Sequence, residues 1–141
     1  MATITDFVQS ASLPWDGKDK FVVMKNRLDF TKKAGAATDV VQALNVPAGT
    51  GVLNVFVKVI TPQGGTCTAT VGDGAGANSW DASTDLNAAA GTITQGAVGT
   101  DAYAVANLGK VYAAADTIDL VLGHTTNVAV IEVYALCYQL G

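Results

Sequence analysis

Apolar and polar residues alternate with a period of two along much of the chain. The clearest example is residues 51–60, where one parity is entirely aliphatic: Leu53, Val55, Val57 and Val59. Because successive side chains of a β-strand point to opposite faces, this alternation predicts a half-buried strand. The letters PQGG at residues 62–65 mark a turn, and residues 68–71 alternate again. We therefore predict a β-hairpin over residues 52–71.

Similar signals recur toward the C-terminus. Residues 117–122 place three large aliphatic side chains on one face: Ile118, Leu120 and Leu122. Residues 128–140 are apolar on both parities apart from Glu132 and Gln139. This pattern predicts a central strand that is covered on both faces, the second face by the same domain or by another subunit. Residues 39–46 fit either a strand or a short helical turn.

Short strands with turn signals about every 8–12 residues are typical of a sandwich or barrel. No segment has a convincing helical period. We count roughly eight strands, which suits a jelly roll of two packed sheets. The prediction is an all-β, jelly-roll-like β-sandwich over residues 21–141.

The first twenty residues differ from the rest and are predicted to form an extended N-terminal arm. They mix Pro14, Gly17 and charges with scattered apolar residues, and such a segment cannot build a core alone. The apolar residues that we expect to act as anchors are Ile4, Phe7, Leu13 and Trp15. The arm either docks onto a neighbouring molecule or folds back onto its own domain.

The composition favours an assembly over a free monomer. The 141 residues are 50% hydrophobic and only 14% charged, against a typical charged share of about 25%. Residues 1–40 hold six basic and five acidic residues, a net of +1, and the remainder holds two basic and seven acidic residues, a net of −5. An acidic body argues against binding nucleic acid. No apolar run reaches the roughly 18 residues that a membrane helix needs.

The chain starts without the basic stretch and apolar core of a secretory signal, so we expect synthesis in a cytoplasm. Cys67 and Cys137 both fall in apolar alternating runs. Two buried thiols are therefore the favoured interpretation, with a disulfide as the alternative.

Candidate catalytic residues are few, and we predict that the protein is not an enzyme. The single histidine, His124, lies in a predicted turn, and no nucleophile motif accompanies it. Glu132 is the one acid inside an apolar strand. A functional Glu132 would have a raised pKa, whereas a carboxylate paired with Lys or Arg is the favoured alternative.

The glycine-rich stretch 67–86, CTATVGDGAGANSWDASTDL, is the most site-like part of the chain. It lacks the lysine of a phosphate-binding loop, and it has neither the third glycine nor the helix of a dinucleotide fold. The oxygen donors for calcium would be Asp73, Asn78, Asp81 and Asp85, but their order is not that of an EF-hand. We favour a glycine-permitted turn followed by a surface loop, with no cofactor and no metal. Trp80 would either plug the end of the sandwich or meet a neighbouring subunit.

Several short motifs together resemble small virion structural proteins of tailed bacteriophages. They are VPAG at 46–49, VFVKVIT at 55–61, TATVGDG at 68–74, WDASTDL at 80–86, GT at 91–92 and GKVYAAADTIDL at 109–120. The resemblance covers roughly residues 40–140 and leaves the arm unexplained.

What the resemblance implies is a capsid decoration, or cement, protein on the surface of a virion. Its partner would be the major capsid protein, and it would form a homo-oligomer, as a trimer. The residues that we expect at its interfaces, besides the arm anchors, are Trp80, Tyr134 and Tyr138. Two alternatives remain: a tail or baseplate component, and a carbohydrate-binding module that uses Trp80 and Tyr103 as exposed aromatics.

Overall fold

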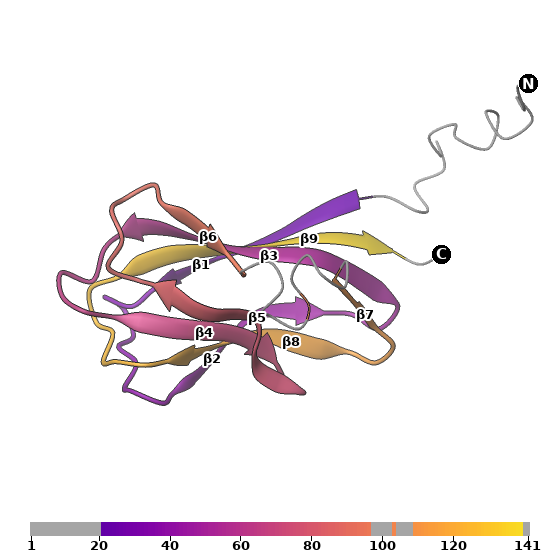
Figure 1. The fold of residues 1–141 in the computed structure, drawn as a ribbon, viewed down its shortest axis with the longest axis horizontal. Helices are drawn as coiled ribbons and strands as arrows, with labels where there is room; N and C mark the ends of the chain where they lie inside the picture. The colour runs from indigo at the N-terminus through magenta and orange to yellow at the C-terminus, as the bar shows by residue number, and fades with distance from the viewer. Residues whose placement is uncertain (1–20, 97–102, 104–108, 140–141) are drawn as a thin grey trace, which may run out of the picture.

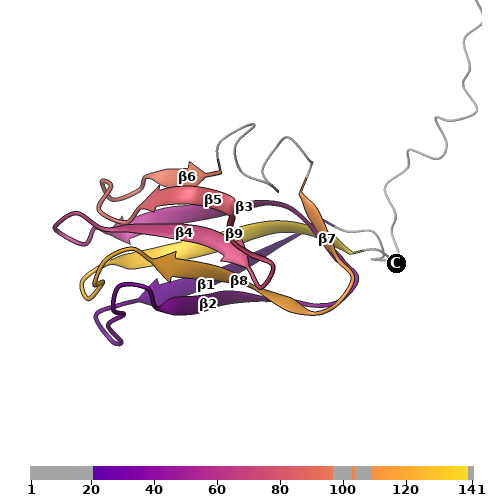
Figure 2. The ribbon, with the colours of Figure 1, turned by 60° about the horizontal axis from the view of Figure 1, so that its bottom comes forward.

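Two antiparallel sheets pack face to face in the computed structural model, which describes residues 21–96, 103 and 109–139 (Figures 1 and 2). The first sheet has the order β1-β9-β3-β6, and β7 also pairs with β3. Its strands are β1 (Phe21–Asp29), β3 (Thr50–Thr61), β6 (Ile93–Gln95), β7 (Lys110–Tyr112) and β9 (Val130–Gln139). The second sheet has the order β2-β8-β4-β5. Its strands are β2 (Val40–Val46), β4 (Thr68–Asp73), β5 (Gly76–Asp85) and β8 (Asp116–Leu122).

The strand order is that of a jelly roll. The chain passes from one sheet to the other at every connection except those between β4 and β5 and between β6 and β7, and β8 and β9 lie in the middle of their sheets. Both sheets are antiparallel throughout their recorded pairings. The prediction of an all-β sandwich is therefore confirmed, with nine strands in place of about eight.

The core lies between the sheets, and the alternation predicts much of it. On β8 the three aliphatic residues Ile118, Leu120 and Leu122 are all buried, as expected. On β9 the parity of Ile131 and Val133 is buried, and the strand lies centrally between β1 and β3. Residues 39–46 form a strand, not a helical turn.

The predicted hairpin over residues 52–71 is wrong. β3 and β4 belong to different sheets, so residues 62–67 cross from one layer of the sandwich to the other. A turn signal shows that the chain reverses, but it does not show which strand becomes the hydrogen-bonded neighbour. A second correction concerns Leu53: a register shift between Val52 and Asn54 places Val52 in the core and leaves Leu53 partly exposed.

The surface loop predicted after Asp73 is mostly a strand. β4 and β5 form a hairpin with a tight turn between Asp73 and Gly76, and the pairing contains two register shifts. Apart from Trp80, the residues of β5 are small or polar, and most of them have low β-propensity. β5 is an edge strand that pairs with β4. This pairing and the burial of Trp80 favour the strand more than the β-propensity of its other residues does.

The predicted arm, with Ile4, Phe7, Leu13 and Trp15, lies outside the described residues, so its separation from the sandwich stays a prediction. Within the described part of the chain, no helix has the length and apolar character needed to cross a membrane.

Candidate functional site

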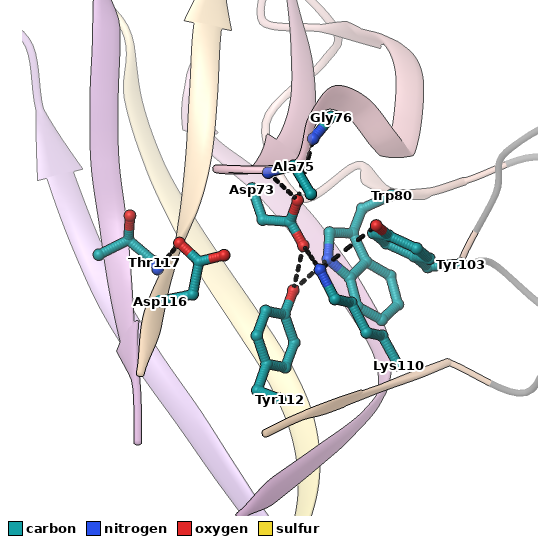
Figure 3. Close-up of polar contacts among 9 residues, drawn as sticks. All are labelled: Asp73, Ala75, Gly76, Trp80, Tyr103, Lys110, Tyr112, Asp116 and Thr117. Carbon is teal, nitrogen blue, oxygen red and sulfur yellow. Dashed lines mark hydrogen bonds and ion pairs between the residues drawn. The ribbon is translucent and has the colours of Figure 1, made fainter. Parts of the chain in front are cut away.

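A buried carboxylate at the end of β4 organises the largest polar cluster among the described residues. The side chain of Asp73 is 0% exposed. Its Oδ2 accepts hydrogen bonds from Lys110 Nζ at 2.6 Å and from the Tyr112 hydroxyl at 2.8 Å (Figure 3). Its Oδ1 accepts from the backbone N–H groups of Ala75 at 2.9 Å and Gly76 at 3.1 Å, which closes the turn between β4 and β5.

Aromatic side chains surround this carboxylate and its lysine. Trp80 Nε1 donates to the Tyr112 hydroxyl at 3.1 Å, and the Trp80 and Tyr103 rings meet edge-on with centroids 5.3 Å apart. Lys110 Nζ lies 4.7 Å from the ring centroid of Tyr103 and 4.6 Å from that of Tyr112. We call the five residues Asp73, Trp80, Tyr103, Lys110 and Tyr112 the Asp73 network. It joins β4, β5 and β7 at one end of the sandwich (Figure 3).

The protonation states of the Asp73 network are fixed near neutral pH. Burial opposes ionisation of Asp73, but hydrogen bonds from Lys110 and Tyr112 outweigh it and hold the pKa of Asp73 below its ordinary value. Burial likewise opposes the charge on Lys110, yet its bond to Asp73 leaves the pKa of Lys110 raised. Burial also raises the pKa of Tyr112 far above its ordinary value. The protonation states of the carboxylate, the ammonium and the neutral phenol are all firmly fixed. Such groups suit a structural role better than proton transfer.

The four oxygen donors considered for calcium do not converge on one point. Asp73 is committed to Lys110, and Asp81 accepts from the Ser83 N–H at 2.9 Å and the Thr84 hydroxyl at 2.5 Å. Asp85 accepts from the Asn87 N–H at 2.8 Å, and Asn78 is exposed on β5. Among residues 21–96, 103 and 109–139, no group of three or more His, Cys, Asp or Glu could hold a metal ion. The carboxylates of Asp73, Asp81 and Asp85 each satisfy nearby N–H or O–H groups.

Trp80 is fully buried, with 0% exposure. Of the two alternatives from the sequence, the structure matches the plug at the end of the sandwich. The expectation that Trp80 is an exposed aromatic for glycan stacking is wrong, because its ring packs in the core and its N–H bonds to Tyr112. A contact of Trp80 with a neighbouring subunit stays a prediction, and in the single chain its side chain is buried.

The remaining candidates of the sequence each have a structural partner. Glu132 forms an ion pair with Lys25 at 3.1 Å, and hydrogen bonds from Tyr134 and Lys25 lower its pKa, which confirms the paired alternative. His124 Nδ1 accepts from the Thr68 N–H at 3.3 Å in a turn. Cys67 and Cys137 are both free and buried, as favoured.

The outer surface of the five-stranded sheet is apolar. Because Ile131 and Val133 of β9 point into the core, Tyr134, Leu136 and Tyr138 point outward. On one side of each, the partner in register is also apolar: Phe56 beside Tyr134, Val23 beside Leu136 and Phe21 beside Tyr138. On the other side, the partners are Lys25, Asn54 and Gly51. We call Phe21, Val23, Phe56, Ile93, Tyr134, Leu136 and Tyr138 the outer apolar face.

A groove runs across this face. Its lining is the middle of the outer apolar face together with one cation: Val23, Phe56, Lys58, Ile93, Tyr134 and Leu136. At one end the ring of Tyr138 lies over Gly51, where a Cβ atom would come within 2.1 Å of Tyr138 Cζ, and Phe21 meets Tyr138 edge-on with centroids 6.4 Å apart. Tyr134 and Tyr138, which the sequence named as interface candidates, thus share one face. The alternation of β9 could have pointed to Leu136, whereas Ile93 lies on a three-residue strand with little sequence signal.

No protein-family model matches the chain, and no curated protein sequence matches it either.

Three solved structures share the fold. A chain in a structure described as "Cyanophage Pam1 capsid asymmetric unit" superposes with a TM-score of 0.63 at 19% identity, covering 92% of each chain. A chain of "Acidic stable capsid structure of Helicobacter pylori bacteriophage KHP30" gives a TM-score of 0.58 at 16% identity, covering 85% of this chain and 87% of that one. A chain of "Capsid of Ralstonia phage GP4" gives 0.57 at 18% identity, covering 92% and 90%. At these identities the likeness establishes the fold alone.

Proposed function

We propose that this chain is a structural component of a bacteriophage capsid: a decoration protein that binds the outer shell as a trimer and stabilises it. The observation that carries the proposal is the match, over most of the chain, to chains from three phage capsid structures. The motifs that resemble virion structural proteins support the same assignment independently of that match.

The surface of the sandwich fits a role in assembly. The outer apolar face is a contiguous set of aliphatic and aromatic side chains, and such patches on a folded protein mark interaction sites. Among the described residues, the Asp73 network is internally satisfied and offers no nucleophile beside a base. Stabilisation of the shell would then be mechanical. Each trimer would bury apolar area against neighbouring capsid subunits, and linkage of three weak contacts would strengthen binding by avidity.

Two observations weigh against the alternatives. All three similar structures are described as capsids, which favours a capsid location over a tail or baseplate. The burial of Trp80 removes the principal aromatic on which a carbohydrate-binding module would depend.

Binding to shells tests the proposal directly. Purified full-length protein is mixed with undecorated capsids of the phage that encodes it, and the shells are imaged by electron microscopy. We expect ordered extra density on the outer surface at threefold positions. Bare shells at saturating protein, or immunogold label on the tail alone, would contradict the proposal.

The predicted arm gives a second test. Deletion of residues 1–20 should leave the sandwich folded, because the strands of both sheets lie within residues 21–139, while binding to capsids weakens. Thermal unfolding and imaging measure the two effects separately. A truncated chain that does not fold would show that the arm belongs to the core.

A further inference from the structure

The groove of the outer apolar face has no occupant among the described residues. Phe21 is 70% exposed, and Val23 and Ile93 are each 60% exposed. Five of the six lining residues are aliphatic or aromatic, and the sixth, Lys58, lies at the Ile93 end. The groove therefore suits a segment that carries large apolar side chains and few charges.

The N-terminal segment enters the sandwich at the rim of this face. Phe21 is the first residue of β1, an edge strand, and it pairs with Tyr138 near the end of β9. In Figure 1 the start of β1 rises away from the two layers. Val22, on the opposite parity, is also exposed, so the first residues of β1 project with both faces uncovered. The twenty residues before Phe21 are attached to this projecting end.

The spacing of apolar residues in that segment favours a contact with another molecule. Residues 18–20, which directly precede β1, are all charged and do not suit an apolar groove. The nearest large anchors are Trp15 and Leu13. At about 3.3 Å per residue, an extended chain carries them about 20 Å and 26 Å beyond Phe21. A domain of this size has a radius of gyration of only about 14 Å. A segment of this length, when extended, is therefore long enough to reach an adjacent copy.

We propose that the groove of the outer apolar face binds the N-terminal segment, residues 1–20, of a second copy of this chain. This arm exchange is the contact that joins the subunits, and it rests on the self-association part of the proposed function. An arm that enters a neighbour's groove makes a head-to-tail contact, which closes into a ring when the rotation between subunits permits. Three arms and three grooves then hold a trimer together, with the charged residues 18–20 spanning the gap between subunits.

Disulfide trapping distinguishes exchange between copies from folding back within one copy. One chain carries Ile93→Cys in the groove together with Phe7→Cys, Leu13→Cys or Trp15→Cys in the arm. The native Cys67 and Cys137 are buried and do not compete. After mild oxidation we expect covalent dimers and trimers on a non-reducing denaturing gel for at least one of the three pairs. Val40→Cys replaces Ile93→Cys as the control, because Val40 is 58% exposed but lies on the other sheet. Internally bridged monomers, or no bridge in any pair, would overturn the proposal.

Loss of the groove provides the second test. Phe56→Asp with Ile93→Asp should reduce the mass in solution, measured by light scattering, from about three times 14.4 kDa to 14.4 kDa. Ile93 lies at an exposed position on a short edge strand. The single variant Ile93→Asp therefore replaces the double variant in this measurement if the double variant unfolds. Val40→Asp should keep the wild-type mass. A trimer that persists in both groove variants overturns arm exchange and leaves capsid binding intact, whereas bare shells overturn only the proposed function.

Discussion

The Asp73 network and the outer apolar face are opposites in how their atoms are satisfied. In the network, Asp73 uses both carboxylate oxygens on four donors, and Lys110 lies against two aromatic rings. On the outer apolar face, Phe21 and Ile93 stay mostly exposed although they are among the most apolar residues of the chain. Among the described residues, the polar atoms of the Asp73 network bond to one another, whereas Phe21 and Ile93 of the outer apolar face stay exposed.

This contrast separates the residues that hold the fold from those that serve assembly. A buried ion pair with its hydrogen bonds made is costly to break but gains nothing from a partner. Exposed apolar area gains free energy whenever a partner covers it, by about 25 cal/mol per Å² removed from water. The polar chemistry that looks like an active site in the sequence therefore supports the architecture, and we propose that the functional surface is the apolar one. Variants in the two regions should produce different kinds of defect.

The largest effect is expected from Asp73→Ala. The substitution leaves Lys110, whose side chain is 23% exposed, without its carboxylate and opens the turn after β4. Breaking a buried ion pair typically costs about 3–5 kcal/mol, and partial exposure of Lys110 places this case near the lower end. Urea denaturation at pH 7 measures the loss in free energy of unfolding. Asp85→Ala, which removes an exposed cap on the same hairpin, should cost about 1 kcal/mol or less.

The pH dependence of the Asp73 effect follows from its depressed pKa. A carboxylate whose pKa is lower in the folded state stabilises the fold above its unfolded pKa, 3.8, and that contribution is lost as the pH falls below this value. The difference between wild type and Asp73→Ala should therefore narrow in strongly acidic solution. The mass of the folded variant should stay that of wild type. A folded variant that dissociates would show that the Asp73 network also supports self-association, contrary to the proposed separation of roles.

Gly51→Ala should have the next largest effect and should act on the outer apolar face. A Cβ atom at residue 51 would come within 2.1 Å of Tyr138 Cζ, so the ring must leave its place over β3. Such overpacking typically costs about 1–3 kcal/mol, and the displaced ring should also weaken self-association. Gly65→Ala is the matched control, because a Cβ there meets nothing within 4 Å.

A double-mutant cycle with Tyr138→Ala tests the cause. If the clash with the ring produces the loss, Gly51→Ala should cost much less once the ring is absent. Equal costs in both backgrounds would place the strain in the backbone of β3 instead.

The existence of most strands could be predicted from the local sequence pattern, and so could some of their inward-facing residues. The pairing of strands and the contacts between distant side chains could not. Alternation identified the buried side of β8, because a half-buried strand has one covered face regardless of its neighbours. On β9 both parities are apolar, so the pattern did not show which side is buried. It misplaced Leu53, because the register shift after Val52 depends on pairing with β9. The contact between Asp73 and Lys110 joins residues 37 positions apart in sequence. The local sequence around either residue does not predict it. The outer apolar face likewise gathers side chains from four strands whose order in the sheet is a property of the whole fold.

Asp119 is the exception among the buried polar groups, and Asp119→Asn should stabilise the protein. Its Oδ1 is the buried side-chain oxygen or nitrogen that lacks a hydrogen-bond partner among the described residues. Burial raises its pKa, and the nearby charges of Asp116 and Asp73 add to the effect. A carboxylate with a raised pKa destabilises the fold as the pH rises from its unfolded pKa through its folded pKa.

We expect Asp119→Asn to raise the free energy of unfolding at pH 7 by about 1 kcal/mol, in line with relief of an unsatisfied buried group. The gain should shrink as the pH approaches 3.8, where wild-type Asp119 also becomes neutral. Denaturant titrations at both pH values provide the measurement. A loss of stability at pH 7 would show that the charge of Asp119 has a favourable partner.

The smallest effect is expected from Glu132→Gln, which changes one of the polar residues on the outer surface of the five-stranded sheet. Glu132 accepts hydrogen bonds from Tyr134 and Lys25, which lower its pKa, so its stabilising contribution is present above its ordinary value of 4.5 and is lost as the pH falls below it. Lys25 is half exposed, and ion pairs at such positions contribute little. Glu132→Gln should therefore change stability at pH 7 least of the four substitutions and should remove part of the acid dependence. Because the groove is lined by apolar side chains and not by Glu132, self-association should also be unchanged. A dissociated Glu132→Gln chain would show that the contact between copies depends on charge, and it would shift the recognition surface from the groove to the Lys25–Glu132 pair.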